Sequence, residues 1–370
     1  MEYKKLGDIA TYINGYAFKP EQRGSEGLPI IRIQDLTGNA YDLGYYNGDY
    51  PKKVELNNGD VLISWSASLG VYLWDRGKAL LNQHIFKVVF DKIEIDKFYF
   101  MYAVEYNLDK MSLKTHGATM KHITKKDFDN VVIPYPDLDY QKEVAYRLTS
   151  LKGIIKKYQE QLDLLDELIK ARFVEMFGEY EASVKLSRYI KELRAGKSLA
   201  GKTKCKNKVL KTGAATFGFF DKEQYKYYPV EYVPNPLHKV EDGDVIISRM
   251  NTPELVGSCS YVFEAPDDMY YPDRLWKTII TEDTNPIFLW QLMWQQDIRK
   301  QIKENSFGTS GTMNNISKVK LLNIKAIDVP LELQNQFASF VQEIDKSRLR
   351  ELLAIKHIKL LLNDSWLLFY

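Results

Sequence analysis

Two long segments of the chain carry apolar residues at alternating steps of four and three. In the first, residues 139–178, these positions run from Val144 and Leu148 to Ile169. Such spacing places the apolar side chains along one seam of a helix. Gly178 stands where a left-handed glycine commonly ends a helix. The pattern predicts a helical rod of about 55 Å.

The second segment, residues 333–370, has the same pattern but breaks it in the middle. Arg348 and Glu351 stand where the first seam has apolar residues. They could pair with each other or mark a shift of the seam that Leu352 takes up. A lone helix of this length would leave its apolar seam in water. We therefore expect the two helices to pack as an antiparallel coiled coil; the alternative is that each packs on its own domain.

The segments that lead into these helices repeat each other. A single offset places Leu-Asp-Tyr-Gln at 138–141 on Leu-Glu-Leu-Gln at 331–334, each shortly after a proline. Gly-Asp-Val-Leu-Ile-Ser at 59–64 likewise has a counterpart at 243–248. Internal repeats indicate duplicated structural units. The order is therefore globular domain, helix, globular domain, helix, in an α+β chain.

Each half is predicted to be rich in strands. Asn-Gly or Asp-Gly before a β-branched run indicates a tight turn into a strand, so we interpret the Gly-Asp pairs as structural. Further strands are expected at 28–32, 70–74, 85–90, 131–133, 258–263, 277–280 and 324–327, and helices at 97–106 and 286–302. Small polar loops with glycine follow those helices. Such loops can approach phosphates and base edges closely, or can be ordinary connections.

Composition sets broad limits. The 370 residues carry 51 Lys and Arg against 49 Asp and Glu, a net charge of +2, which neither favours nor excludes nucleic acid. Two cysteines are too few for a zinc knuckle or a disulfide scaffold. No apolar run reaches the ~20 residues of a membrane span, and the first residues do not form a signal peptide. We therefore expect a cytoplasmic protein.

The local distribution of charge is more informative. Between residues 185 and 211 there are ten Lys or Arg side chains against a single acidic one, Glu192. A basic block of this kind is a typical footprint of phosphate contacts. It can also be a solvated surface.

We find no catalytic motif. Ala195-Gly196-Lys197-Ser198 resembles the end of a P-loop, but Lys191 stands where that pattern requires a glycine. The Asn-Pro pairs at 235 and 285 lack the second proline by which amino-methyltransferases hold a base. The five histidines are scattered and form no triad or zinc pattern. We therefore predict a binding protein without a cofactor or metal of its own.

These features, in this order, resemble the specificity subunits of type I restriction–modification systems. The resemblance covers nearly all of the chain. It rests on several duplicated marks: Lys4-Lys5-Leu6-Gly7-Asp8-Ile9, Gly-Asp-Val-Leu/Ile-Ile-Ser in each half, Asn82-Gln83-His84-Ile85, Pro272-Asp273-Arg274-Leu275, and the Leu-Asp/Glu-x-Gln starts of both helices.

The resemblance implies two target-recognition domains, residues 1–138 and 179–332, that each read one half of a split DNA sequence. The helices at 139–178 and 333–370 would form the spacer between them. Two methyltransferase subunits would dock along the spacer and methylate adenine at N6 from S-adenosylmethionine. Restriction subunits can add ATP-driven translocation and cleavage. Those cofactors belong to the partners, so this chain is expected to be non-catalytic.

Bases in the major groove are read by Arg, Asn, Gln, Ser and Thr side chains. Our DNA-binding candidates in the first domain are Asn14, Tyr16, Lys19, Arg32, Ser64, Ser66, Ser68, His84, Lys121 and His122. Those in the second domain are Lys197, Ser198, Lys211, Arg249, Asn251, Arg274, Thr309, Ser310 and Asn315. His84 and Trp276 could equally belong to a core.

Two other functions are consistent with the residues. The chain could be a DNA-binding module with its own nuclease or methyltransferase activity, which predicts that it binds S-adenosylmethionine or a divalent metal. It could also be a coiled-coil scaffold that binds proteins and no DNA. In that case, replacing the lysines between 197 and 211 would leave all binding unchanged.

Overall fold

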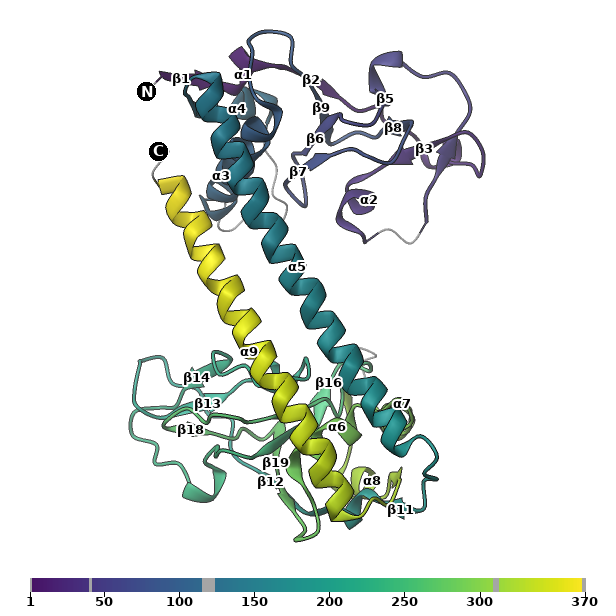
Figure 1. Cartoon of the computed structure of the whole chain (residues 1–370), viewed down its shortest axis with the longest axis vertical. Coiled ribbons are helices and arrows are strands. Elements are labelled where there is room, and N and C mark those ends of the chain that lie inside the picture. The colour runs from purple at the N-terminus through teal and green to yellow at the C-terminus, as the bar shows by residue number, and fades with distance from the viewer. Residues whose placement is uncertain (1, 40–41, 115–123, 309–312, 368–370) are drawn as a thin grey trace. The chain divides into compact units, whose positions relative to one another are not determined.

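The structure is a computed structural model that describes residues 2–39, 42–114, 124–308 and 313–367. The chain divides into two compact units. Unit 1 comprises Met1–Glu160 and Leu352–Tyr370, and unit 2 comprises Gln161–Glu351. The two long helices, α5 (Leu138–Phe177) and α9 (Leu331–Leu367), each contribute residues to both units (Figure 1). Helix α5 begins one residue before its predicted start at 139, and α9 begins two residues before its predicted start at 333. Helices and sheets together give the expected α+β class.

Unit 1 is built on a four-stranded antiparallel sheet with the strand order β2-β9-β6-β7. Its strands are β2 (Thr11–Asn14), β6 (Val61–Ser64), β7 (Gly70–Leu73) and β9 (Ile85–Val89). A second sheet contains β3 (Leu28–Ile31), β4 (Tyr45–Tyr46), β5 (Glu55–Leu56) and β8 (Ala79–Leu81), in which β3 and β8 are parallel. The remaining elements are β1 (Glu2–Lys5), α1 (Leu6–Ile9), η1 (Pro20–Gln22), α2 (Ile33–Thr37), η2 (Lys52–Val54), α3 (Lys97–Lys114), α4 (Lys125–Asp129) and β10 (Val132–Tyr135).

Unit 2 repeats this plan with the strand order β12-β19-β15-β17. These strands are β12 (Ile190–Ala195), β15 (Val245–Ser248), β17 (Cys259–Tyr261) and β19 (Leu275–Ile280). Parallel strands β13 (Lys208–Leu210) and β18 (Met269–Tyr270) match β3 and β8, with β14 (Tyr225–Tyr227) on the other side of β13. The remaining elements are β11 (Val184–Lys185), η3 (Leu186–Arg188), η4 (Thr212–Ala215), η5 (Pro236–His238), β16 (Met250–Asn251), α6 (Pro286–Met293), α7 (Gln296–Asn305), β20 (Asn314–Asn315), α8 (Lys318–Leu322) and β21 (Lys325–Ala326).

The Gly-Asp turns hold both main sheets in the same way. Gly59 has φ +93° and Gly243 has φ +85°, a conformation that favours glycine. Asp60 accepts a 2.8 Å hydrogen bond from the Asn57 backbone, and Asp244 accepts the matching 2.8 Å bond from Glu241. These bonds support the structural interpretation of the Gly-Asp pairs.

A lysine from the neighbouring strand completes each turn. Lys87 Nζ lies 2.8 Å from Asp60, and Lys277 Nζ lies 3.2 Å from Asp244. Both ammonium groups also donate to a backbone carbonyl, that of Glu55 in unit 1 and that of Lys239 in unit 2. We call these two arrangements the lysine–aspartate locks.

The glutamine that begins each long helix is a second repeated structural contact. Gln141 accepts a 2.9 Å bond from the Asp96 backbone and donates to the Pro136 carbonyl at 2.8 Å. Gln334 accepts a 2.9 Å bond from the Asn285 backbone. It also donates to the carbonyls of Val329 and Asp283, at 2.7 and 3.1 Å. Both side chains are at most 1% exposed, so each ties its helix start to the domain before it.

Within unit 2 the two long helices contact each other and run antiparallel. The rings of Phe173 and Phe337 lie 5.4 Å apart, and Asp166 pairs with Arg348. Arg348 also lies 3.6 Å from Asp345 of its own helix, so its ion pairs are to these aspartates and not to Glu351. In unit 1, Leu362 of α9 packs on the core that holds Val144 and Leu148 of α5. Leu352 is 48% exposed and does not take up the seam.

Several predicted elements have different bounds in the structure. The predicted helix 286–302 is two helices, α6 and α7, separated at Trp294–Gln295, where Trp294 Nε1 donates to the Cys259 carbonyl. Strands β1 and β11 at the start of the two halves were not predicted; they pair with β10 and β21. Trp276 is 1% exposed and belongs to the core of unit 2. None of the described helices is long and apolar enough to cross a membrane.

Candidate nucleic-acid interface

Three loops of unit 1 meet at one end of its main sheet. Strand pairing places Asn14 beside Phe86, and Ser64 beside both Ile85 and Gly70. The end of β2, the β6–β7 connection and the segment before β9 therefore share one edge. We call residues 14–19, 64–70 and 82–85 the unit 1 loop cluster.

Most candidates from the first half lie in this cluster, but they differ in exposure. Asn14, Lys19, Ser68 and His84 are exposed, and Tyr16 is half-buried. Side chains of the exposed group are accessible to a bound molecule. His84 is therefore a surface residue and not part of the core.

The serines of β6 have structural contacts instead. Ser64 is fully buried, and its hydroxyl donates to the Ser68 carbonyl across the turn. Ser66 is 7% exposed. Direct contact of either side chain with DNA would require the turn to open, so we place only Ser68 of the three serines on the accessible surface.

Arg32 also has a structural environment. Its side chain is 7% exposed, and its Nε lies 3.0 Å from the Asp35 carboxylate. A second contact joins its guanidinium to the backbone carbonyl of Asp42. The hydrogen bond to Asp35 raises the pKa of Arg32. A guanidinium with these partners stabilises the α2 turn, which favours a structural role over base contact.

The same end of the unit 2 sheet carries a corresponding cluster. Pairing places Ala195 beside Trp276 and Ser248 beside Leu275. The long β15–β17 connection and the glycine loop after α7 join them through β16 and β20. We call residues 195–200, 248–258, 271–275, 306–308 and 313–316 the unit 2 loop cluster.

Four predicted candidates come together in the unit 2 loop cluster. Arg249 Nε lies 3.4 Å from the Asn315 Oδ1, and the Arg249 backbone donates to the Arg274 carbonyl at 3.0 Å. Asn251 pairs with Asn314 in the β16–β20 ladder. Arg274 is exposed, whereas Arg249, Asn251 and Asn315 are half-buried. Two guanidinium groups and two amides on one surface can donate to base edges and phosphates.

The basic block is only partly neutralised inside the protein. Arg188, Arg194 and Lys206 form ion pairs with Asp328, Glu192 and Asp268 respectively. Six further lysines of the block are exposed and have no acidic partner within ion-pair distance among the described residues: Lys185, Lys191, Lys197, Lys202, Lys204 and Lys211. The pKa of His238 is lowered, first by burial and then by the positive charges of Arg194 and Lys197. These charges give the block a positive potential.

The residues that resemble the end of a P-loop, at 195–198, have a structural role instead. A Cβ on Gly196 would lie 1.8 Å from the Tyr271 carbonyl oxygen, so this position requires glycine for a close backbone approach. The next residues form no helix before β13. The Ser198 hydroxyl donates to the Asp273 carboxylate. Gly15 makes the equivalent approach to Asn82 in unit 1, at 1.9 Å for a built Cβ.

Four candidates lie outside the described residues: Lys121, His122, Thr309 and Ser310. Sequence reasoning also missed one position, Trp65. The Trp65 backbone donates to the His84 carbonyl at 3.3 Å, as the Arg249 backbone does to Arg274, so Trp65 and Arg249 occupy equivalent sites. The sequence could have identified Trp65, because Trp65 and Arg249 both directly follow the repeated Gly-Asp-Val-Leu/Ile-Ile-Ser motif.

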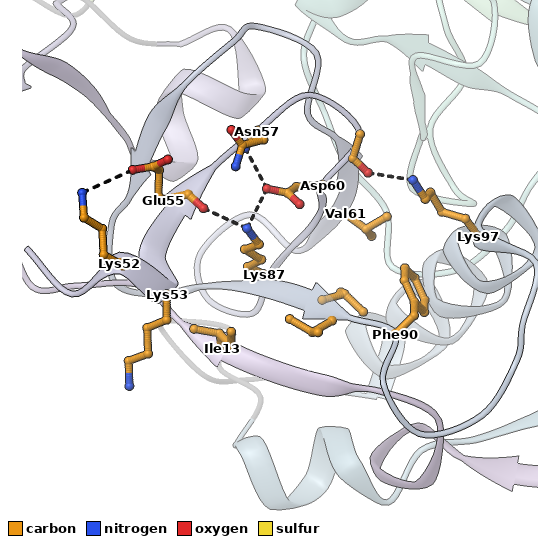
Figure 2. A pocket seen from close by; sticks show the side chains of 13 residues that line it. Ile13, Lys52, Lys53, Glu55, Asn57, Asp60, Val61, Lys87, Phe90 and Lys97 are labelled. Carbon is orange, nitrogen blue, oxygen red and sulfur yellow. Dashed lines mark hydrogen bonds and ion pairs between the residues drawn. The ribbon is translucent and has the colours of Figure 1, made fainter.

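A hollow of about 510 Å³ lies at the other end of the unit 1 sheet. Lysines 52, 53, 87 and 97 line it. Figure 2 shows Lys87 directed toward Asp60, and Lys97 donating to the Gly59 carbonyl at 2.9 Å. These bonds belong to the lysine–aspartate lock and its surroundings. Among the described residues, no group of three or more His, Cys, Asp or Glu could hold a metal ion.

Comparison with known proteins shows what the chain is similar to. Residues 1–164 match the model of the type I restriction modification DNA specificity domain. The type I restriction enzyme MjaVIII specificity subunit of Methanocaldococcus jannaschii is 24% identical over 374 residues, which cover 93% of this chain and 86% of that protein. The EcoBI specificity subunit of Escherichia coli is 27% identical over 168 residues, which cover 45% of this chain and 35% of that protein.

A solved structure shows the same fold. The S subunit of the type I restriction–modification system from M. genitalium aligns with a TM-score of 0.57 and 14% identity, covering 98% of this chain and 94% of that one. Along most of its length the chain is therefore similar to type I restriction–modification specificity subunits, and its first 164 residues match the specificity domain. The resemblance found in the sequence is confirmed.

Proposed function

We propose that each unit reads one half of a split DNA target with its loop cluster, and that the chain thereby directs a type I restriction–modification complex to its sites. The observation that carries this proposal is the duplicated scaffold with different side chains on it. At equivalent positions unit 1 has Trp65 and His84, and unit 2 has Arg249 and Arg274. A common frame with different surface groups is what two readers of two different sequences require.

The chemistry of the two clusters differs in a way that predicts different targets. Arginine binds guanine O6 and N7 with two hydrogen bonds, and asparagine binds adenine similarly. Unit 2 presents arginine and asparagine, with exposed lysines nearby for phosphates. Unit 1 presents Asn14, Ser68 and His84. We therefore expect the unit 2 half-site to depend on guanine more strongly than the unit 1 half-site.

The long helices would form the spacer. An α5 of 40 residues spans about 60 Å, and the unit 2 contacts of Phe173 with Phe337 are those of antiparallel neighbours. We propose that α5 and α9 pair along their seams as an antiparallel coiled coil. Two methyltransferase subunits would dock on it, and restriction subunits can join them. Methylation of adenine N6, ATP use and cleavage would then belong to the partners, with this chain non-catalytic.

The direct test is to co-express the chain with its cognate methyltransferase subunit and map N6-methyladenine across the host genome. We expect a motif of two short specified parts with a fixed unspecified gap. Arg249→Ala with Arg274→Ala should relax one part only, and Ser68→Ala with His84→Ala should relax the other. An assembled complex that leaves no new methylation contradicts the proposal.

The same experiment separates the two other functions. Methylation or cleavage by the isolated chain would support an enzyme in its own right. An assembled complex that leaves no new methylation would support a scaffold that binds no DNA, and methylation unchanged by all four substitutions would place base reading on other residues.

A further inference from the structure

Two phenylalanines of unit 2 are exposed to solvent on a turn that is fixed by a hydrogen bond and by packing on the core. Phe217 is 69% exposed and Phe219 is 55% exposed. Between them, Gly218 has φ +84°, and its carbonyl accepts a 3.0 Å bond from Trp290 Nε1. Phe220, the next residue, packs on the unit 2 core. The turn is therefore fixed at its centre and on one side, while two large rings remain in water.

The phenylalanine turn adjoins the unit 2 loop cluster. Asn251 Nδ2 lies 3.4 Å from Thr216 Oγ1, and the Thr216 hydroxyl bonds to the Thr212 carbonyl at 3.0 Å. Thr216 is 6% exposed and directly precedes Phe217. Phe217, the first of the two exposed rings, therefore directly follows the residue that contacts the candidate base-reading side chain of Asn251.

The charge around the turn favours an anionic partner. Between residues 208 and 226 there are four lysines, at 208, 211, 222 and 226, against two acidic residues, at 221 and 223, and Lys222 is paired with Glu264, which leaves a small positive excess. Exposed aromatic groups beside a binding surface generally mark a contact site. Phenylalanine has no hydrogen-bonding group, so its contact with DNA must be with base faces or other apolar atoms.

In unit 1 the glycine that follows the corresponding strand has no aromatic residue directly beside it among the described residues. There, Gly38 has φ +75° and follows β3 and α2 as Gly218 follows β13 and η4. Its neighbours are Thr37 and Asn39, which are partly or fully exposed. The described neighbours of Gly38 and of Gly218 thus differ in side-chain chemistry, as the residues of the two loop clusters do.

We infer that Phe217 and Phe219 form an aromatic wedge that contacts the bases of the half-site read by unit 2. Proteins that insert apolar wedges between base steps use Phe, Leu, Ile, Met and Pro for this purpose. A ring that stacks on a base also reads nucleic acid with little demand on sequence. The inference rests on the proposed function and adds an aromatic contact to those of the unit 2 loop cluster.

The experiment uses the full chain in complex with its methyltransferase subunits and a duplex with the split target. Phe217→Ser with Phe219→Ser removes the wedge, and Phe217→Leu with Phe219→Leu keeps apolar groups of similar reach. Thr37→Ala with Asn39→Ala is the matched control in unit 1. The readouts are the Kd and the fluorescence of 2-aminopurine, placed in either half-site away from the methylated adenine.

The serine pair should weaken binding by at least about tenfold, and the leucine pair by less. In the wild-type complex, 2-aminopurine fluorescence should rise in the unit 2 half-site, and the serine pair should abolish the rise. The control pair should bind like wild type. Because the rings are exposed, the thermal unfolding temperature of the serine pair should equal that of wild type.

Two results would overturn the inference. One is a serine pair with wild-type affinity and fluorescence on a target that the wild-type complex methylates. The other is a serine pair that no longer assembles with the methyltransferase subunits, since the rings would then contact protein. A wild-type complex that leaves no split motif instead contradicts the proposed function, so the two failures are distinguishable.

Discussion

Units 1 and 2 use the same internal contacts and differ in what they expose. Both have a main sheet of the same strand order, a lysine–aspartate lock and a glutamine that fixes the start of a long helix. At equivalent positions of the two loop clusters, unit 1 has Trp65 and His84 where unit 2 has Arg249 and Arg274. The repeated residues therefore hold the frame, and the differing residues are the ones available for recognition.

The locks themselves provide the largest expected difference between the units. The side chains of Lys277 and Asp244 are each 9% exposed, whereas those of Lys87 and Asp60 are 16% and 21% exposed. Removing one partner of a buried ion pair leaves an uncompensated charge, which costs about 3–5 kcal/mol. We expect Lys277→Met to destabilise unit 2 by about this amount, and Lys87→Met to destabilise unit 1 by about half of it. Hydrogen exchange of the β15 and β6 amides measures each unit separately.

The pH dependence of Lys277→Met sharpens the comparison. Burial raises the pKa of Asp244, and the charge of Lys277 opposes that shift. Without the lysine the carboxylate is disfavoured, and protonation removes its charge. The loss of stability in this variant should therefore shrink as the pH falls from 7.5 to 5. A loss that is equal at both pH values, or greater in Lys87→Met than in Lys277→Met, would contradict this account.

Replacing the glutamines that begin the two long helices should also destabilise unit 2 more than unit 1, with smaller effects than the lysine substitutions. Replacing Gln334 by Leu leaves three backbone groups without their partner, whereas Gln141→Leu leaves two. Each unsatisfied buried group costs about 1–3 kcal/mol, partly offset by the apolar side chain. We expect losses of about 2–4 kcal/mol for Gln334→Leu and about 1–3 kcal/mol for Gln141→Leu. Denaturant unfolding, followed in each unit by hydrogen exchange, tests the order; the exposed Gln161→Leu is the control.

The repeated contacts were the part of the structure most open to sequence reasoning. The Gly-Asp turns and the strands at 61–64 and 245–248 follow from local residue patterns. The break between α6 and α7 depends on Trp294 reaching Cys259, a contact distant in the sequence. The unit 2 loop cluster likewise depends on Asn251 pairing with Asn314. The structural partners of Arg32 were also not foreseen, although Asp35 lies one helical turn later.

The ion group formed by Asp345 and Arg348 of α9 with Asp166 of α5 should give a pH effect of intermediate size. Burial raises the pKa of Asp345 to about 6 from 3.8; Arg348 lowers it and Asp166 raises it. Since the folded state holds this proton more tightly than the unfolded state, the stabilisation is complete below about pH 4. It is lost as the pH rises to about 6. The loss is about 1–3 kcal/mol.

Asp345→Asn should therefore raise the thermal unfolding temperature at pH 8 and leave it almost unchanged at pH 4. The α5 seam has Ile155 where α9 has Arg348, so no such effect is expected from the exposed Asp163→Asn. Equal shifts of the Asp345→Asn variant at both pH values would show that folding does not raise the pKa of Asp345.

The smallest expected effect compares the phosphate contacts of the two units. Lys197 and Lys211 of unit 2 and Lys19 of unit 1 are all exposed. Each phosphate contact that is lost lowers the slope of log K against log salt concentration by about 0.9. We expect Lys197→Gln with Lys211→Gln to lower the slope by about two, and Lys19→Gln by about one at most. The loss should be the same on specific and unrelated duplexes, because phosphates carry no sequence information. A loss confined to the specific duplex would instead place these lysines on bases, and an unchanged slope would remove the basic block from the interface.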